Sequence, residues 1–219
     1  MMNKVNVVTL TAPRSPAAEA YRVLRVNLAF TSLDKPLKTI VISAPAITAT
    51  KSEVAVNLAV VMAQAGQRVI LVDADLRRPA LHPCFNAPQE PGLTGYMVSQ
   101  DGESALILEE TAVPHLQLLP SGALPPNPAD ILGSQKMEQL LTLLKARADV
   151  VVLDTPPVTV AVDASVLGAR ADGLLLVVQA GHTRRDHIAQ AKEWLERYHV
   201  HLLGAVFTDA PEGDLLTGY

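Results

Sequence analysis

Short runs of aliphatic residues recur along the chain and alternate with longer amphipathic stretches. The apolar runs cover residues 37–43, 68–73, 116–120, 149–154, 173–179 and 202–208. Because these runs lack polar alternation, they are typical of strands that helices cover on both faces, as in parallel sheets. Six such strands suffice for the core of a doubly wound sheet.

The amphipathic stretches between the runs predict helices. They cover residues 16–31, 51–65, 130–146, 162–171 and 185–199. Residues 79–128 are rich in Pro and Gly, so we expect surface loops with short helices there. The alternation of strand and helix predicts one α/β domain over residues 1–219, with a mostly parallel sheet and helices on both faces. We expect tails at residues 1–14 and 209–219.

Composition and charge restrict the partners and the location. Of the 219 residues, 49% are hydrophobic and 18% are charged, which is too apolar for a disordered polymer. No apolar stretch approaches the roughly 20 residues of a membrane span, so we expect no direct membrane insertion. The net charge of −4, without a basic patch, argues against nucleic acid as a partner. A single cysteine and no secretory signal favour a cytoplasmic location.

Three of the predicted strands lead into residues suited to phosphate and metal chemistry. Asp73 and Asp75 follow one strand, Asp154 follows another, and Lys51 and Ser52 open the helix after the first strand. Ligands of open parallel sheets sit at the carboxyl ends of strands, so we expect these side chains to meet. A Lys can serve phosphates, a Ser hydroxyl can hold Mg²⁺, and an Asp can accept a proton. The alternative, that each Asp only caps a turn, weakens when three such features coincide.

Longer motifs surround these residues. VILVDADLRRP has three aliphatics before D-x-D-x-R, and VVLDTPPV has three aliphatics before D-x-x-P. SGALPPNPADIL, at residues 121–132, contains S-G-x-x-P-P-N-P. Together they resemble the second aspartate motif, the Walker B motif and a proline-rich segment of the bacterial tyrosine kinases of capsule and exopolysaccharide export. That family lies within the MinD/ParA-like P-loop ATPases, so the resemblance implies a P-loop NTPase fold.

The resemblance also implies a cofactor, Mg-ATP, and a reaction, phosphoryl transfer to tyrosine. It assigns catalysis to Lys51, Asp73, Asp75 and Asp154, with Asp73 activating the attacking hydroxyl. It places Mg²⁺ on Ser52, Asp75 and Asp154. Its remaining nucleotide contacts fall on Thr48, Ala49, Thr50, Lys51, Ser52 and Arg77.

Partners follow from the same resemblance. Glu19, Arg22 and Arg25 match an E-x-x-R-x-x-R pattern that lies, in the family, on a helix contacting the next subunit of a ring. Without the family, the same residues form an ordinary solvated helix face. A homo-oligomer is therefore expected, together with a membrane-protein activator at the inner face of the cell membrane. Tyr219, the only tyrosine after Tyr198, is the candidate phosphoacceptor.

The phosphate loop departs from the family. Residues 42–53 read ISAPAITATKSE where family members have a stretch like ITSPGPGEGKST, and the first glycine of the chain is Gly66. P-loop glycines let backbone N–H groups turn inward at φ values that a Cβ disfavours. Forcing Thr48 and Thr50 into such values costs on the order of 1–3 kcal/mol each. Nucleotide affinity then falls by roughly 30-fold to more than 1,000-fold.

Two further departures concern the same site. Glu53 stands where the family has Thr, in the helical turn whose positive potential should hold phosphate. Residues 208–209 are Thr-Asp where the family often has an Asn that helps to hold the base. The surplus of acid predicts that Lys51 pairs with Asp73, Asp154 or Glu53.

The sequence therefore predicts a domain like the bacterial tyrosine kinases, with its aspartates retained and ATP binding weak or lost. Three alternatives stay open. The protein is an active ATP-dependent tyrosine kinase, a non-enzymatic scaffold or regulator, or a MinD/ParA-like ATPase switch.

Overall fold

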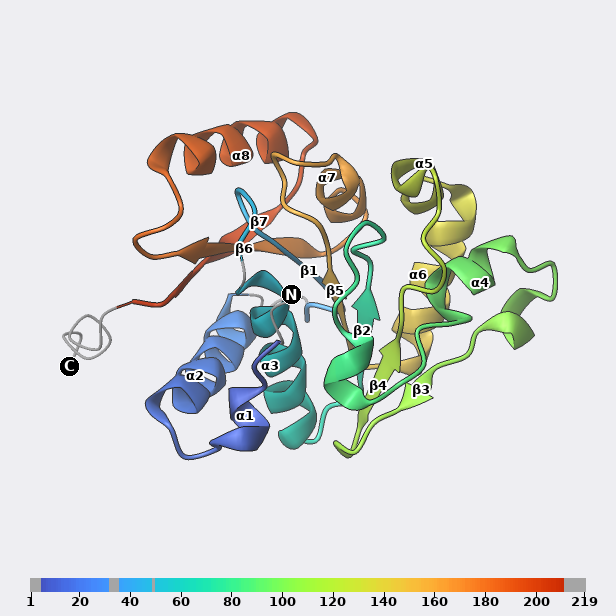
Figure 1. The fold of residues 1–219 in the computed structure, drawn as a ribbon, viewed down its shortest axis with the longest axis horizontal. Coiled ribbons are helices and arrows are strands. Elements are labelled where there is room, and N and C mark those ends of the chain that lie inside the picture. Colours follow the sequence, from blue (N-terminus) through green and yellow to red (C-terminus); the bar gives the residue numbers. More distant parts are fainter. Residues whose placement is uncertain (1–4, 32–35, 49, 211–219) are drawn as a thin grey trace.

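A seven-stranded sheet forms the centre of the molecule in a computed structural model that describes residues 5–31, 36–48 and 50–210 (Figure 1). The strand order is β3-β4-β2-β5-β1-β6-β7, and every neighbouring pair is parallel except β3–β4. The strands are β1 (Thr39–Ser43), β2 (Val69–Asp73), β3 (Glu109–Glu110), β4 (Leu116–Leu119), β5 (Val150–Asp154), β6 (Gly173–Gln179) and β7 (Leu202–Thr208). The predicted fold class is confirmed, with the short antiparallel β3 as an addition.

Helices cover both faces of the sheet. They are α1 (Val8–Thr11), α2 (Pro16–Phe30), α3 (Lys51–Gln64), α4 (Gly92–Val98), α5 (Pro128–Leu132), α6 (Gln135–Arg147), α7 (Asp163–Gly168) and α8 (Arg185–Arg197), with 3-10 turns η1 (His82–Phe85) and η2 (Gly102–Ala105). One hydrophobic core joins the sheet to α4–α8, and the other joins it to α2 and α3. Figure 1 shows α1, α2 and α3 on one side and α7 and α8 on the other.

Helix α3 is the most deeply buried helix near the site. Its sequence, KSEVAVNLAVVMAQ, is apolar nearly all round, and its residues 54–63 are all buried. A helix of this kind needs cover on two sides, and it lies between the sheet and α2. Because α3 begins directly after the β1 loop, its first residues are fixed at the carboxyl edge of the sheet.

The predicted helix 130–146 is two helices. Ser134 separates them, because its hydroxyl accepts a hydrogen bond from the backbone N–H of Met137 and caps α6. The carbonyl of Gly133 accepts from the guanidinium of Arg170 at 2.9 Å, which holds the break in place. The predicted helix 162–171 is shorter at both ends, as α7.

The N-terminal residues differ from the expected tail. Thr9 is fully buried, and both its N–H and its hydroxyl donate to Asn57 Oδ1, at 3.0 and 2.8 Å. Asn57 Nδ2 donates to the carbonyl of Asn6 at 2.8 Å. A buried Asn on an apolar helix needs such partners, and the segment over residues 6–9 supplies them. Residues 211–219, which include Tyr219, lie outside the described residues.

The proline-rich motif has a structural use at its first two residues. Gly122 has φ of +78°, and a Cβ there would lie 2.2 Å from Thr94 Oγ1 and 2.4 Å from the carbonyl of Pro91. The backbone N–H of Thr94 donates to the carbonyl of Ser121 at 3.0 Å. The Ser-Gly pair thus allows the loop after β4 to pack directly against the start of α4.

Candidate functional site

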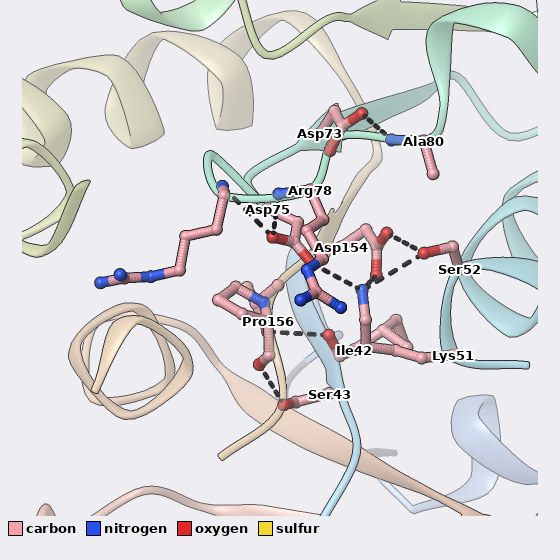
Figure 2. Close-up of polar contacts among 12 residues, drawn as sticks. Ile42, Ser43, Lys51, Ser52, Asp73, Asp75, Arg78, Ala80, Asp154 and Pro156 are labelled. Atoms are coloured by element: carbon pink, nitrogen blue, oxygen red, sulfur yellow. Dashed lines mark hydrogen bonds and ion pairs between the residues drawn. The ribbon is translucent and has the colours of Figure 1, made fainter. Parts of the chain in front are cut away.

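The candidate site lies at the carboxyl ends of β1, β2 and β5, the three strands at the centre of the sheet (Figure 2). Asp73 and Asp154 are register partners at the ends of β2 and β5. Lys51 and Ser52 begin α3, which follows β1. Three separate elements therefore bring the predicted residues together, as the strand-end argument expects.

Lys51 is the centre of the cluster. Its side chain is 6% exposed, and Nζ forms an ion pair with Asp154 Oδ1. Nζ also lies 3.3 Å from Ser52 Oγ and 3.5 Å from Asp75 Oδ2. Burial alone lowers the pKa of Lys51, but the charges of Asp154 and Asp75 outweigh it and raise the pKa above its usual value. The three donors of the ammonium group thus face three neighbours.

The predicted pairing of Lys51 with Asp154 is confirmed. Its other partner is Asp75, whereas Asp73 and Glu53 form no ion pair with it among the described residues. The carboxylate of Glu53 instead bonds to the N-terminal segment, where its Oε1 accepts a hydrogen bond from the backbone N–H of Asn6 at 3.1 Å.

Asp154 is fully buried and both of its oxygens have partners. Ser52 Oγ donates to Oδ2 at 2.6 Å, and Lys51 contacts Oδ1. Burial raises the pKa of Asp154, and the two donors act against that rise. Lysine, serine and aspartate therefore form one closed set of contacts.

Asp73 differs from Asp154 in having one oxygen without a partner. Its Oδ2 accepts from the backbone N–H groups of Ala80 and Leu81, at 3.0 Å each. Its Oδ1 is buried and finds no hydrogen-bond partner among the described residues. Burial and, next, the charge of Asp154 raise the pKa of Asp73 to about 7. A carboxyl group with such a pKa can take up and release a proton near neutral pH.

Asp75 is held by the backbone that follows it. Its Oδ1 accepts from the N–H groups of Arg77, at 3.3 Å, and Arg78, at 3.0 Å. The guanidinium of Arg77, predicted to contact nucleotide, forms two hydrogen bonds with Asp163, at 2.9 and 3.1 Å. The sequence analysis missed Asp163, because an acid in the first turn of a helix resembles an ordinary capping charge.

The phosphate loop avoids the backbone strain predicted for its threonines. Thr50 has φ of −98° and ψ of −9°, which is ordinary for an L residue. Among the described residues, positive φ outside glycine occurs only at Asn86, His115, His199 and Asp209. The loop therefore does not follow the glycine-dependent course at Thr48 and Thr50, and Ala49 between them lies outside the described residues.

The threonine hydroxyls instead tie the loop to the ends of two strands. Thr48 Oγ1 donates to Gln179 Oε1 at 2.7 Å and lies 3.1 Å from Thr50 Oγ1. Thr50 Oγ1 lies 2.8 Å from Thr208 Oγ1. We call Thr48, Thr50, Gln179 and Thr208 the threonine latch. Gln179 Nε2 extends it to Asp209 at 2.7 Å, so the positions expected near the base are occupied by this network.

The predicted subunit-contact residues lie on α2. Arg22 donates to Glu19 at 2.7 Å and to the carbonyl of Pro13 at 2.6 Å, on an exposed face. Arg25 lines a cavity of ≈ 280 Å³ together with Leu28 and other apolar residues. The contact of these residues with another subunit stays a prediction.

The oxygen donors of the site fit a metal that arrives with a nucleotide. Ser52, Asp75 and Asp154 all lie around Lys51, and Mg²⁺ uses one or two carboxylates with substrate phosphates. Within residues 5–31, 36–48 and 50–210, no group of three or more His, Cys, Asp or Glu side chains is arranged to hold a metal ion. In the same ranges, no helix has the length and apolar character for a membrane span.

Sequence relatives show which family the chain belongs to. A family model described as an AAA domain matches residues 37–201. The chain is 40% identical over 201 residues to the tyrosine-protein kinase YwqD of Bacillus subtilis, covering 92% of this chain and 84% of that protein. It is 32% identical over 213 residues to the tyrosine-protein kinase CpsD of Streptococcus agalactiae, covering 96% of this chain and 92% of that protein.

Solved structures share the fold of this chain. The chimerical protein CapA2B2 superposes with a TM-score of 0.87 at 33% identity, covering 94% of this chain and 90% of that one. The kinase domain of the Escherichia coli tyrosine kinase ETK gives 0.87 at 29%, covering 95% and 81%. A Mycobacterium smegmatis cobyrinic acid a,c-diamide synthase with ADP and magnesium shares the fold, with a TM-score of 0.69 at 18% identity over 82% of this chain and 79% of that one. The chain therefore belongs to the bacterial tyrosine-kinase family, on a P-loop NTPase fold.

Proposed function

We propose that this protein is a tyrosine-kinase-like component of a polysaccharide assembly or export system that binds Mg-nucleotide only weakly. The metal side of the site, formed by Ser52, Asp75 and Asp154, has its oxygen donors gathered around Lys51. The phosphate side, formed by Lys51 and the loop that carries Thr48 and Thr50, is closed by the threonine latch. The observation that carries the proposal is the threonine latch, which lies beside a complete cluster of Lys51, Ser52 and the three aspartates. Membership in the bacterial tyrosine-kinase family supports the choice of nucleotide and of tyrosine as the acceptor.

The metal side supports phosphoryl-transfer chemistry. Bound Mg-ATP would supply the transferable phosphoryl group. Ser52, Asp75 and Asp154 would hold the metal, and Lys51 would hold the phosphates. The unpaired oxygen of Asp73 suits it to accept the proton of an attacking tyrosine hydroxyl.

The phosphate side opposes binding in two ways. A phosphate must compete with Asp154 and Asp75 for the donors of Lys51. A loop that turns its N–H groups inward must also break the latch, at about 0.5–1.5 kcal/mol for each hydrogen bond. Adopting positive φ at Thr48 and Thr50 adds on the order of 1–3 kcal/mol each. These contributions all lower the affinity for nucleotide.

Isothermal calorimetry with Mg-ADP and Mg-ATP tests the proposal. We expect the triple variant Thr48→Gly/Thr50→Gly/Glu53→Thr to bind these nucleotides more tightly than the wild type, by roughly 30-fold or more. The matched control is Thr142→Gly, on the exposed face of α6 away from the site, which should leave affinity unchanged. Micromolar affinity in the wild type, or a folded triple variant without any gain, would contradict the closed phosphate side.

An active kinase is the second candidate, and it is favoured by the buried Oδ1 of Asp73, which has no hydrogen-bond partner among the described residues, together with the rise in the pKa of that carboxyl group to about 7. Transfer of labelled phosphate from Mg-ATP to tyrosine by the wild type would establish it. As parts of the same proposal, the family resemblance supports a membrane-protein activator and a homo-oligomer that uses Glu19 and Arg22.

A further inference from the structure

An ion pair with one buried partner lies just outside the cluster around Lys51: the Asp163 side chain is fully buried, whereas that of Arg77 is 41% exposed. Asp163 is fully buried at the start of α7, and both of its oxygens accept from the guanidinium of Arg77. The two residues are 86 positions apart in the chain. The pair therefore connects the segment after β2 with the helix that follows β5.

We propose that Asp163 is a positioning residue that sets the carboxylate of Asp75 through Arg77. This role rests on the proposed function, because it concerns the metal side of the nucleotide site. The contacts run from Asp163 to the Arg77 guanidinium, and from the N–H groups of Arg77 and Arg78 to Asp75 Oδ1. Asp75 Oδ2 then lies 3.5 Å from Nζ of Lys51. Figure 2 shows Asp75 between the Arg78 backbone and Lys51.

The segment over residues 74–81, which follows β2, is anchored by hydrogen bonds at both ends. The Arg77–Asp163 ion pair anchors its middle. At the start, the N–H of Ala74 donates to the carbonyl of Asp154 at 2.9 Å. At the end, the N–H groups of Ala80 and Leu81 donate to Asp73. Between these anchors, the side chain of Arg77 is fastened by Asp163, and its bidentate geometry fixes orientation as well as distance.

The arrangement gives the two oxygens of Asp75 separate tasks. Oδ1 is occupied by two backbone donors, so Oδ2 is the oxygen directed to Lys51 and the metal side. If Arg77 is released, its backbone N–H loses its fixed direction and Asp75 can rotate. The metal-dependent part of nucleotide affinity should then fall, whereas contacts made to nucleotide without metal should change little.

Amide hydrogen exchange followed by NMR tests this role without any nucleotide. In Asp163→Asn we expect exchange at the Arg77 and Arg78 amides to rise about tenfold or more. The matched control is Asp149→Asn, which removes the bidentate partner of Arg68 in an exposed ion pair at the amino-terminal edge of β5. That control should leave the Arg77 and Arg78 amides unchanged. Unchanged exchange at these amides in a folded Asp163→Asn protein overturns the proposal.

Should Asp163→Asn fail to fold, Arg77→Lys takes its place, because lysine keeps the charge but loses the bidentate geometry. The expected rise in exchange at residues 77 and 78 is the same, and its absence counts equally against the proposal.

Calorimetry in the Thr48→Gly/Thr50→Gly/Glu53→Thr background adds the functional arm. Adding Asp163→Asn should weaken Mg-ADP binding by roughly fivefold to tenfold and metal-free ADP binding by less than about twofold. Equal losses with and without Mg²⁺ overturn the positioning role. If neither the wild type nor the Thr48→Gly/Thr50→Gly/Glu53→Thr variant binds nucleotide, the proposed function fails. The exchange measurement still decides whether Asp163 positions Asp75.

Discussion

At the site, one buried ammonium group lies against two buried carboxylates. Lys51, Asp75 and Asp154 are each at most 9% exposed in their side chains, and the ammonium group lies against both carboxylates. A buried charge without a partner is costly, so the cluster depends on the presence of every member. Ser52 completes it by donating to the second oxygen of Asp154.

Removing the cation should therefore destabilise the fold. Lys51→Met leaves Asp154 buried without its charged partner, and we expect the free energy of unfolding at pH 8 to fall by about 3 kcal/mol. Urea unfolding measures the change. Lys192→Met is the matched control, because Lys192 forms only an exposed ion pair with Glu196 at 3.6 Å, and it should cost less than about 0.5 kcal/mol. Equal stability of the two variants would show that the buried pair contributes nothing.

Helix α3 links the site to the N-terminal segment. Its first turn carries Lys51, Ser52 and Glu53, and its second turn carries Asn57. Glu53 and Asn57 hold residues 6–9 by hydrogen bonds. Glu53, which stands where the family has Thr, thus has a structural role, because it accepts a hydrogen bond from the backbone of Asn6. Burial raises the pKa of Glu53, and the N–H of Asn6 acts against that rise.

Asn57 is the buried part of this link. Asn57→Ala removes three hydrogen bonds to residues 6 and 9 and leaves the Thr9 hydroxyl without its acceptor. We expect a loss of about 2–3 kcal/mol in the free energy of unfolding. Gln64→Ala, at an exposed position of the same helix, should change it by less than about 0.5 kcal/mol. A loss no larger than that of the control would mean that the segment contributes little to stability.

At the scale of the whole molecule, the sequence predicts the sheet well and the site in part. Each of the six predicted strands occurs within two residues of its expected ends, because buried parallel strands have a continuous apolar pattern. The meeting of Lys51 with Asp154 follows from the strand ends alone. The threonine latch and the Arg77–Asp163 pair do not, because their partners lie 131 and 86 positions away and no local pattern marks them.

Asp73 makes the stability of the whole molecule depend on pH. Its pKa is about 7 in the folded protein against an ordinary value of 3.8, so between these values the folded state binds more protons than the unfolded state. The contribution of Asp73 to stability is then greatest below about pH 4 and is lost as pH rises through about 7, an effect on the order of 2–4 kcal/mol. Carboxyl groups whose pKa is lowered in the folded state, such as Asp149, have the opposite effect, because their contribution to stability is lost as pH falls.

The variant Asp73→Asn isolates that contribution. Its amide oxygen can still accept from Ala80 and Leu81, but it carries no charge at any pH. In urea unfolding at pH 5 and pH 8, the wild type should lose more stability with rising pH than Asp73→Asn does. Asp149→Asn is the control, because Arg68 lowers the pKa of Asp149 to about 2 and removes it from this range. If Asp73→Asn keeps the wild-type difference between the two pH values, Asp73 is already ionised at pH 5 and its role as a proton acceptor near neutral pH loses its basis.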